Sequence, residues 1–112
     1  MAWLMDGEGG TILVADDGDR LLGVAVALLK NPLSHPLLVA RKIVEIDNIV
    51  VRRRYQRQGI GSRLVTACVE WARQRGADDV EIAVHDFNIA AAAFYRALGF
   101  EMSVHLLRRR LA

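Results

Sequence analysis

The sequence predicts a mixed α/β fold that combines an antiparallel hairpin with a parallel strand–helix–strand unit. Two apolar runs, Thr11–Ala15 and Arg20–Leu29, lie on either side of the turn-forming residues 16–19 and indicate the hairpin. Later in the chain, a strand, an amphipathic helix and a second strand follow one another within about forty residues, which favours parallel pairing through a right-handed crossover. Gly76 and Gly99 mark the ends of two predicted helices.

The length and composition are those of one small domain, residues 1–112. Hydrophobic residues make up 53% of the chain, so a packed core is expected rather than disorder. Met1–Gly10 carries three glycines and is expected to have little fixed structure. The longest apolar run, Leu21–Leu29, has nine residues, whereas a helix that spans a bilayer needs about twenty. Residues 1–10 contain no basic n-region, so we expect a cytoplasmic protein with no membrane partner.

The charge pattern does not favour a nucleic-acid partner. The formal net charge is +2, from 15 Lys and Arg against 13 Asp and Glu. Arginines cluster at 52–54 and 108–110, but only Tyr55 supplies an aromatic ring nearby, and nucleic-acid-binding faces interleave such rings with charge. The single cysteine, Cys68, cannot form an internal disulfide and is expected in the core, because it lies on the apolar side of a predicted helix.

A basic glycine loop separates the predicted strand Leu37–Val51 from the predicted helix Gly61–Arg75. Its sequence is Gln56-Arg57-Gln58-Gly59-Ile60-Gly61. Glycine permits positive φ and close approach, so consecutive backbone N–H groups here are able to form a concave anion site. The first turn of the helix adds unpaired N–H groups and the positive end of its dipole. Five arginines lie between residues 52 and 63 with no carboxylate from 51 to 67, so we expect a multivalent anion such as a pyrophosphate.

Three kinds of nucleotide-binding loop have this general form, and residue types separate them. A P-loop ends in Gly-Lys-Ser/Thr, but the Gly61-Ser62 pair carries no lysine. A dinucleotide fingerprint requires a third glycine where this chain has Leu64. It also requires an acidic residue at the end of the next strand, and His85 and Asp86 are poor substitutes for that residue. The remaining form is Gln/Arg-x-x-Gly-x-Gly/Ala, which is matched by Gln56, Gly59 and Gly61.

Two carboxylates lie in the middle of the otherwise apolar strand 37–51. Simple alternation places Glu45 and Asp47 on one face with Ile43, Ile49 and Val51. The other face then carries Val44, Ile46, Asn48 and Val50. Charged groups in a central strand are costly without a partner or a wet cleft, which favours a functional role. Two structural explanations stay open: ion pairs with arginines on the sheet face, and a β-bulge that turns one carboxylate outward.

The second half of the chain contains a further strand, a capped helix and a final strand. The strand is predicted over Asp79–His85, and Asn88 is the expected N-cap of a helix over Ile89–Leu98. Phe100–Leu107 is predicted to form the last strand. The segment Asn31–Pro36 is a predicted loop, because its two prolines cannot donate to a sheet ladder.

Two motifs together resemble the GCN5-related N-acetyltransferase (GNAT) superfamily. The first is the glycine loop, and the second is Asn88-x5-Phe94-Tyr95-x3-Gly99-Phe100, which begins thirty-two residues after Gln56. The resemblance covers the chain from about Gly10 onward. It implies an α/β (α+β) fold, with a mixed, mostly antiparallel sheet, a central parallel βαβ unit and helices packed on it. In such a fold Val44–Val51 splays from Val80–Val84, and the pantetheine arm of acetyl-CoA enters the gap.

The resemblance also implies a cofactor site. Backbone groups of Ile49, Val50 and Val51 would bind pantetheine as though it were an additional strand. The pyrophosphate would be held by backbone amides of Gln56, Arg57, Gln58, Gly59, Ile60, Gly61 and Ser62. Asn88 would hydrogen-bond the pantetheine arm or support the loop, and Arg53 or Arg57 would reach the 3′-phosphate.

Acyl transfer to an amine requires a base, an oxyanion donor and an acid. An acceptor amine with a pKa of about 10.4 is mostly protonated at neutral pH, so a proton must leave before attack. Glu45 and Asp47, directly or through water, are both candidate bases. The backbone N–H of Val50 or Val51 would stabilise the oxyanion. Tyr95 would protonate the leaving thiolate, and its structural alternative is a packed aromatic residue. No metal is implied.

The chain departs from the family at its N-terminal end. Members usually carry a first strand and two helices before the hairpin, and here only about ten residues precede it. The acceptor side would be truncated, completed by a second subunit, or open. A homodimer is expected, because a missing layer exposes apolar surface. The predicted function is an acetyl-CoA-dependent N-acetyltransferase acting on a primary amine of a small molecule or protein, and the alternative is a non-catalytic CoA-binding or interaction module.

Overall fold

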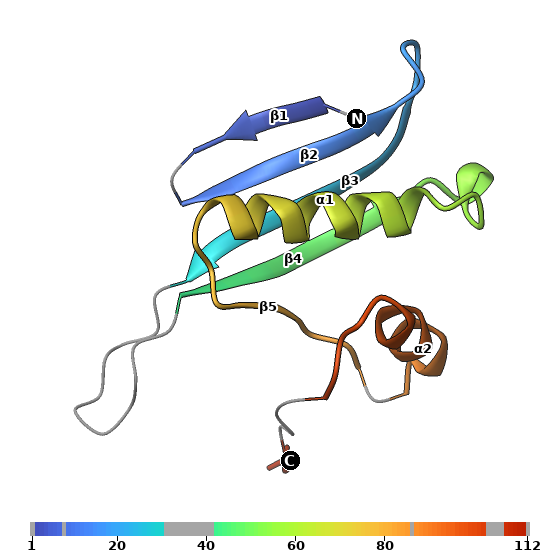
Figure 1. The fold of residues 1–112 in the computed structure, drawn as a ribbon. Coiled ribbons are helices and arrows are strands. Elements are labelled where there is room, and N and C mark those ends of the chain that lie inside the picture. Colours follow the sequence, from blue (N-terminus) through green and yellow to red (C-terminus); the bar gives the residue numbers. More distant parts are fainter. Residues whose placement is uncertain (1, 8, 31–41, 86, 103–106, 112) are drawn as a thin grey trace.

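The computed structural model describes residues 2–7, 9–30, 42–85, 87–102 and 107–111. Its strands are β1 (Ala2–Asp6), β2 (Gly10–Asp16), β3 (Leu21–Lys30), β4 (Ile43–Val51) and β5 (Asp79–Ile82). Its helices are the 3-10 turn η1 (Arg53–Tyr55), α1 (Ile60–Gln74) and α2 (Ile89–Ala97). Helix α1 runs along one face of the sheet, and α2 lies beyond β5 (Figure 1). None of the described helices has the length and apolar character needed to cross a bilayer.

Strand pairing confirms both predicted units. The sheet has five strands in the order β1-β2-β3-β4-β5. β2 and β3 pair antiparallel as a hairpin. β4 and β5, which precede and follow α1 in the sequence, pair in parallel. The remaining pairs, β1 with β2 and β3 with β4, are antiparallel. The sheet is therefore mixed and mostly antiparallel, as expected.

The segment before the hairpin differs from its prediction. The expectation of little fixed structure over Met1–Gly10 is wrong for Ala2–Asp6, which forms β1 and pairs with β2. A strand therefore precedes the hairpin, although none was expected there. The physical reason is that β2 has a free edge, and its unpaired backbone groups bond to an extended neighbour of almost any sequence.

Three other boundaries also differ. β4 begins at Ile43, and residues 31–41, which include the predicted loop Asn31–Pro36, lie outside the described residues. β5 ends at Ile82, so the prediction of a strand as far as His85 is too long. Of the predicted strand Phe100–Leu107, residues 100–102 and 107 are not in a strand, and 103–106 lie outside the described residues. Alternating hydrophobicity marks a buried face, but a strand also requires a partner for its backbone groups.

The core lies between α1 and strands β2 to β4. Leu64, Cys68 and Trp71 on α1 are buried, and they pack against a set of buried strand residues, Leu13, Ala25, Ala27, Val44 and Ile46. Small residues on β3 let the helix approach. A methyl group built on Gly23 would lie 2.9 Å from the Val50 carbonyl oxygen and 3.2 Å from a Leu64 methyl carbon. The predicted burial of Cys68 is confirmed.

A β-bulge in β4 changes which residues share a face. Ile46 pairs with Ala27 of β3 and Asn48 pairs with Val26, so Asp47 is an extra residue without a partner in the register. The alternation of side chains shifts by one at this point. Ile49 packs against the core on the same side as Ile46, rather than on the side of Glu45 as simple alternation predicted.

Candidate functional site

Two residues of the glycine loop, Arg57 and Gly59, have positive φ. Gly59 has φ +79° and is the N-cap of α1. Arg57 has φ +65° and is the only non-glycine residue with positive φ in the described part of the chain. An arginine in this conformation costs about 1 to 2 kcal/mol relative to ordinary backbone. Strain of this kind is often retained where a loop must present its N–H groups to a ligand.

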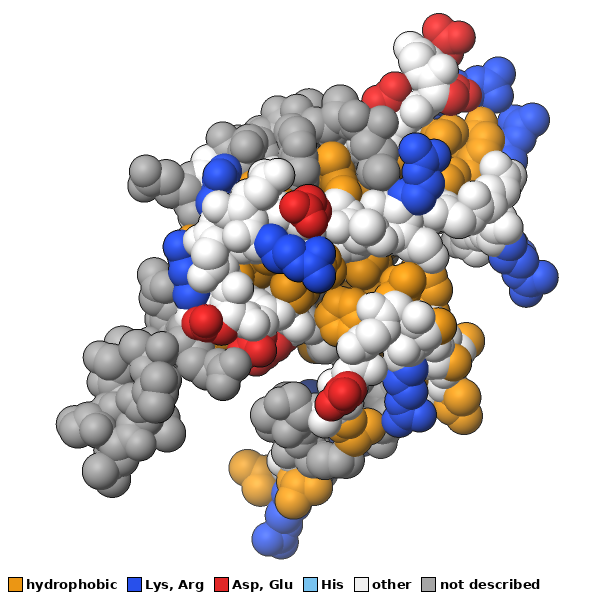
Figure 2. Space-filling view, in the orientation of Figure 1, with side chains coloured by type: hydrophobic (Ala, Val, Ile, Leu, Met, Phe, Trp, Pro, Cys, Tyr) orange, Lys and Arg blue, Asp and Glu red, His pale blue; other side chains and the backbone are white. Residues whose placement is uncertain are grey.

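The loop borders a cavity of about 360 Å³ at the N-terminal end of α1. The cavity is lined by Val51, Tyr55, Gln56, Arg57, Gly59, Ile60, Gly61, Ser62 and Phe94. Seven of these nine were predicted site residues, and the structure brings them together. Gln58 is exposed and does not line the cavity. Lys and Arg side chains are prominent at the end of the molecule where the hairpin turn and this loop lie (Figure 2).

Side chains connect the loop to the sheet. Gln56 Nε2 donates a hydrogen bond of 3.1 Å to the Val51 carbonyl oxygen at the end of β4. Arg20 Nη1, from the hairpin turn, donates to the Tyr55 hydroxyl at 3.3 Å. Tyr55 also packs against the core. The loop is therefore held by both the β2–β3 hairpin and β4.

Sequence reasoning missed Arg20, Tyr55 and Phe94 as residues of this site. Arg20 lies far from the loop in sequence, and no local pattern indicates that it contacts Tyr55. The sequence pattern indicated Phe94 only as part of a motif, although its ring lies against Gly61 and lines the cavity. Its position one residue before Tyr95 was the available signal.

β4 and β5 part beside the loop. Their last paired residues are Ile46 and Ile82, yet β4 continues to Val51. The backbone of residues 47–51 therefore has no β5 partner in the described register. The expected splay is present, and Gln56 links its β4 side directly to the glycine loop.

Glu45 and Asp47 are in different environments. Glu45 forms an ion pair with Lys30 of β3, and its side chain is 25% exposed. Asp47 lies at the bulge and is exposed. The prediction that both share a face with Ile49 is wrong, because the bulge interrupts the alternation. Both structural explanations thus apply in part, with a lysine rather than an arginine as the ion-pair partner.

A group of charges surrounds the Lys30 ammonium. Glu81 is paired in register with Glu45 across the parallel strands. The hydrogen bond to Glu45 raises the pKa of Lys30 above its ordinary value, and the charges of Asp47 and Glu81 act in the same direction. The acids closest to the strand opening are therefore partly balanced by one lysine.

Helix α2 holds Asn88 and Tyr95 outside the cavity. Asn88 caps the helix as predicted, because its Oδ1 accepts a 3.1 Å hydrogen bond from the Ala91 N–H. Tyr95 packs edge-on against Phe94 and Phe100, at centroid distances of 5.0 and 5.7 Å. Burial raises the pKa of the Tyr95 hydroxyl, so this group stays protonated well above neutral pH.

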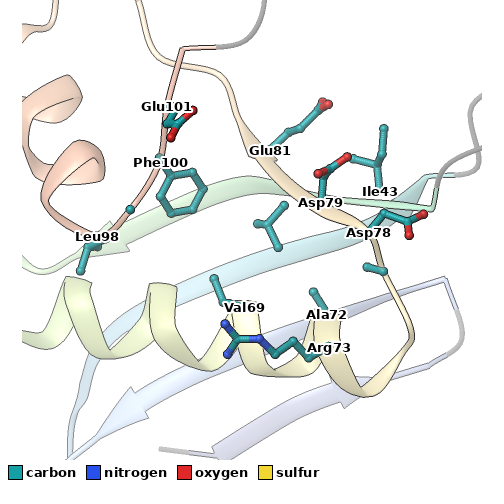
Figure 3. A pocket seen from close by; sticks show the side chains of 13 residues that line it. Ile43, Val69, Ala72, Arg73, Asp78, Asp79, Glu81, Leu98, Phe100 and Glu101 are labelled. Carbon is teal, nitrogen blue, oxygen red and sulfur yellow. The ribbon is translucent and has the colours of Figure 1, made fainter.

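A second, larger cavity lies along β5. Its volume is about 870 Å³, and it is bounded by α1, β5 and the segment after α2 (Figure 3). Four carboxylates line it, those of Asp78, Asp79, Glu81 and Glu101, against the single base Arg73. An anionic cofactor is repelled by such a lining. The smaller cavity, with its amides and Arg57, is the better anion site.

A comparison with protein families agrees with this geometry. The family model described as acetyltransferase (GNAT) family matches residues 1–100. The chain belongs to this family. GNAT membership accounts for the glycine loop at the start of α1 and for the parted parallel strands as parts of one arrangement.

Individual relatives of this GNAT chain include proteins from bacteria and plants. It is 35% identical over 95 residues to the uncharacterised N-acetyltransferase YvbK of Bacillus subtilis, covering 85% of this chain and 56% of that protein. It is also 35% identical over 86 residues to the L-ornithine N5-acetyltransferase NATA1 of Arabidopsis thaliana, covering 75% of this chain and 37% of that protein. The chain thus spans about half or less of the length of these relatives.

Solved structures show the same fold. A mutant of the BH1408 protein from Bacillus halodurans superposes with a TM-score of 0.86 at 29% identity, covering 95% of this GNAT chain and 68% of that one. The aminoglycoside N-acetyltransferase AAC(6')-Iy, solved in complex with CoA, has a TM-score of 0.79 at 18% identity, covering 93% and 68% of the two chains.

Proposed function

We propose that this protein transfers an acetyl group from acetyl-CoA to a primary amine by direct attack. The observation that carries the proposal is the hydrogen bond between Gln56 and Val51, which joins the anion loop to the open half of β4. A ligand with a diphosphate at one end and an extended amide-bearing arm at the other fits both features at once. Acetyl-CoA is such a ligand, and the family to which the chain belongs supports this choice.

The cofactor half of the proposal uses backbone groups. Amides from Gln56 to Ser62 would bind the pyrophosphate, with Arg57 or Arg53 near the 3′-phosphate. The unpaired edge of Ile49, Val50 and Val51 would bond the pantetheine arm as an added strand. The Asn88 side-chain oxygen already caps α2, and the amide nitrogen of the same side chain would donate to the arm.

The chemical half of the proposal uses three side chains. Glu45 or Asp47 would accept the proton of the acceptor amine, directly or through water. The backbone N–H of Val50 or Val51 would stabilise the oxyanion. Tyr95 would protonate the thiolate, and a raised pKa keeps its proton available at neutral pH. Its edge-on packing in an aromatic cluster means that this role requires the hydroxyl end to face the thioester.

The acceptor is proposed as a small amine, and two relatives guide the choice. One relative is named an L-ornithine N5-acetyltransferase and another is named an aminoglycoside N-acetyltransferase. A homodimer of one-domain chains and a cytoplasmic location remain parts of the proposal. The alternative is a non-catalytic module, which would bind CoA through the same loop but would not acetylate an amine.

The test is a calorimetric titration with acetyl-CoA, followed by CoA release across ornithine, polyamines, aminoglycosides and peptide N-termini. We expect binding, and release with at least one amine. Tyr95→Phe and the Glu45→Gln/Asp47→Asn double variant should retain binding and lose turnover by about 100-fold or more. Binding with no turnover on any amine identifies the non-catalytic module, and no binding overturns the proposal.

A further inference from the structure

Lysine is scarce in this chain, and the two lysines face opposite sides of the sheet. Of 15 basic residues only Lys30 and Lys42 carry a primary amine, and arginine, whose guanidinium stays charged, is not a nucleophile under such conditions. Lys30 pairs in register with Ile43, the neighbour of Lys42. The Lys42 Nζ donates to the carbonyl oxygen of Arg75 at the end of α1, 2.5 Å away. Lys30 instead forms an ion pair with Glu45.

The Lys30 ammonium lies on the face away from α1. Leu28 pairs with Glu45, so Lys30 and Glu45 are diagonal neighbours on this face. Their side chains form the ion pair described above, with 54% of the Lys30 side chain and 25% of the Glu45 side chain exposed. A primary amine therefore already contacts Glu45, one of the two candidate bases.

This amine also lies close to the opening between the parallel strands. Glu45 pairs with Glu81, and the next pair, Ile46 with Ile82, is the last before β4 and β5 part. Lys30 itself pairs with Ile43, three residues or roughly 10 Å along the strand from Ile46. Its flexible four-carbon stem already carries the ammonium toward the opening as far as Glu45, one residue before Ile46.

We propose that Lys30 is an acyl acceptor, so that the protein acetylates its own Lys30 when acetyl-CoA is bound. This inference rests on the proposed function and adds a modification site to it. No other reactant is required, because the thioester supplies the acetyl group and CoA is the leaving group.

Acetylation begins when the Lys30 ammonium loses one proton to the Glu45 carboxylate, and the free amine then attacks the thioester carbonyl. A C–N bond forms and the C–S bond breaks. The second proton lost by nitrogen balances the proton taken up by the thiolate through Tyr95, which leaves Nε-acetyl-Lys30 and free CoA. Acetylation removes the positive charge, so the ion pair with Glu45 is lost.

The experiment is incubation of the full chain with acetyl-CoA and no added amine, followed by peptide mass spectrometry. We expect one acetyl group, on Lys30, and an initial rate constant that does not change on dilution of the protein. Lys30→Arg keeps a cation beside Glu45 and should remain unmodified. Glu45→Gln should slow labelling by about 100-fold or more. Lys42→Arg is the matched control and should label Lys30 at the original rate.

Three results would overturn the inference. Equal labelling of Lys30 and Lys42, as in the heat-unfolded chain, would show simple chemical acetylation. Undiminished labelling in Glu45→Gln would remove the role of the ion pair. An unmodified Lys30 in a protein that releases CoA with an added amine would overturn this inference alone, whereas failure to bind acetyl-CoA would overturn the proposed function as well.

Discussion

The ring of Phe94 lies against Gly61, so that a methyl group built on this glycine would lie 3.4 Å from Phe94 Cζ. This contact joins α2 to the first turn of α1 at the wall of the glycine-loop cavity. A side chain larger than a methyl group at residue 61 would therefore disturb both the cavity and the position of α2.

We predict that Gly61→Val weakens acetyl-CoA binding and loosens α2. The branched side chain must displace Phe94, and overpacking of this kind costs about 1 to 3 kcal/mol. Calorimetry measures the affinity, and hydrogen exchange measures the protection of α2. Unchanged affinity together with unchanged protection of α2 amides would contradict the placement of Phe94 against the loop.

A second prediction concerns Gly23, which lets α1 approach the sheet. The methyl group of Gly23→Ala would lie 2.9 Å from a backbone oxygen of Val50, which has little freedom to move. We expect a loss of about 1 to 3 kcal/mol in the free energy of unfolding, measured by urea denaturation. Gly9→Ala is the control, because nothing lies within 4 Å of the added methyl group. Equal stability of the two variants would argue against the close packing of β4 and α1 around Gly23.

A third prediction concerns the link from the loop to β4. Gln56→Glu replaces the donor with a carboxylate that cannot bond the Val51 carbonyl oxygen, so the 3.1 Å contact is lost. A neutral hydrogen bond contributes about 0.5 to 1.5 kcal/mol. We therefore expect the Kd for acetyl-CoA to rise about two- to tenfold. Gln58→Ala keeps its backbone amide and serves as the control. An equal effect of both substitutions would mean that the link has no special role.

A fourth prediction follows from the burial of Cys68. Burial raises the pKa of this thiol from 9.0 to about 11. The unfolded chain ionises first, so stability should not depend on this group below pH 9 and should fall as pH rises from 9 to about 11. Urea denaturation across this range, compared with Cys68→Ala, isolates the effect. Rapid alkylation of native protein at pH 8 would be incompatible with a buried thiol.

The local signals in the sequence determined much of the proposed cofactor side. Gly59 and Gly61 mark the loop, Asn88 marks the start of α2, and alternation marks the hairpin. Each of these is a preference of a few neighbouring residues for one backbone conformation, so it is visible in the sequence. The structure confirms the positive φ at Gly59 and the cap at Asn88.

The proposed acceptor side was decided by tertiary contacts. The bulge at Asp47 depends on how β4 registers against β3, and one extra residue reverses the faces beyond it. The Lys30–Glu45 ion pair and the Arg20–Tyr55 hydrogen bond each join separate segments of the chain. β1 forms because β2 offers a free edge. Local pattern determines what a segment prefers, whereas pairing between distant segments determines which side chains meet.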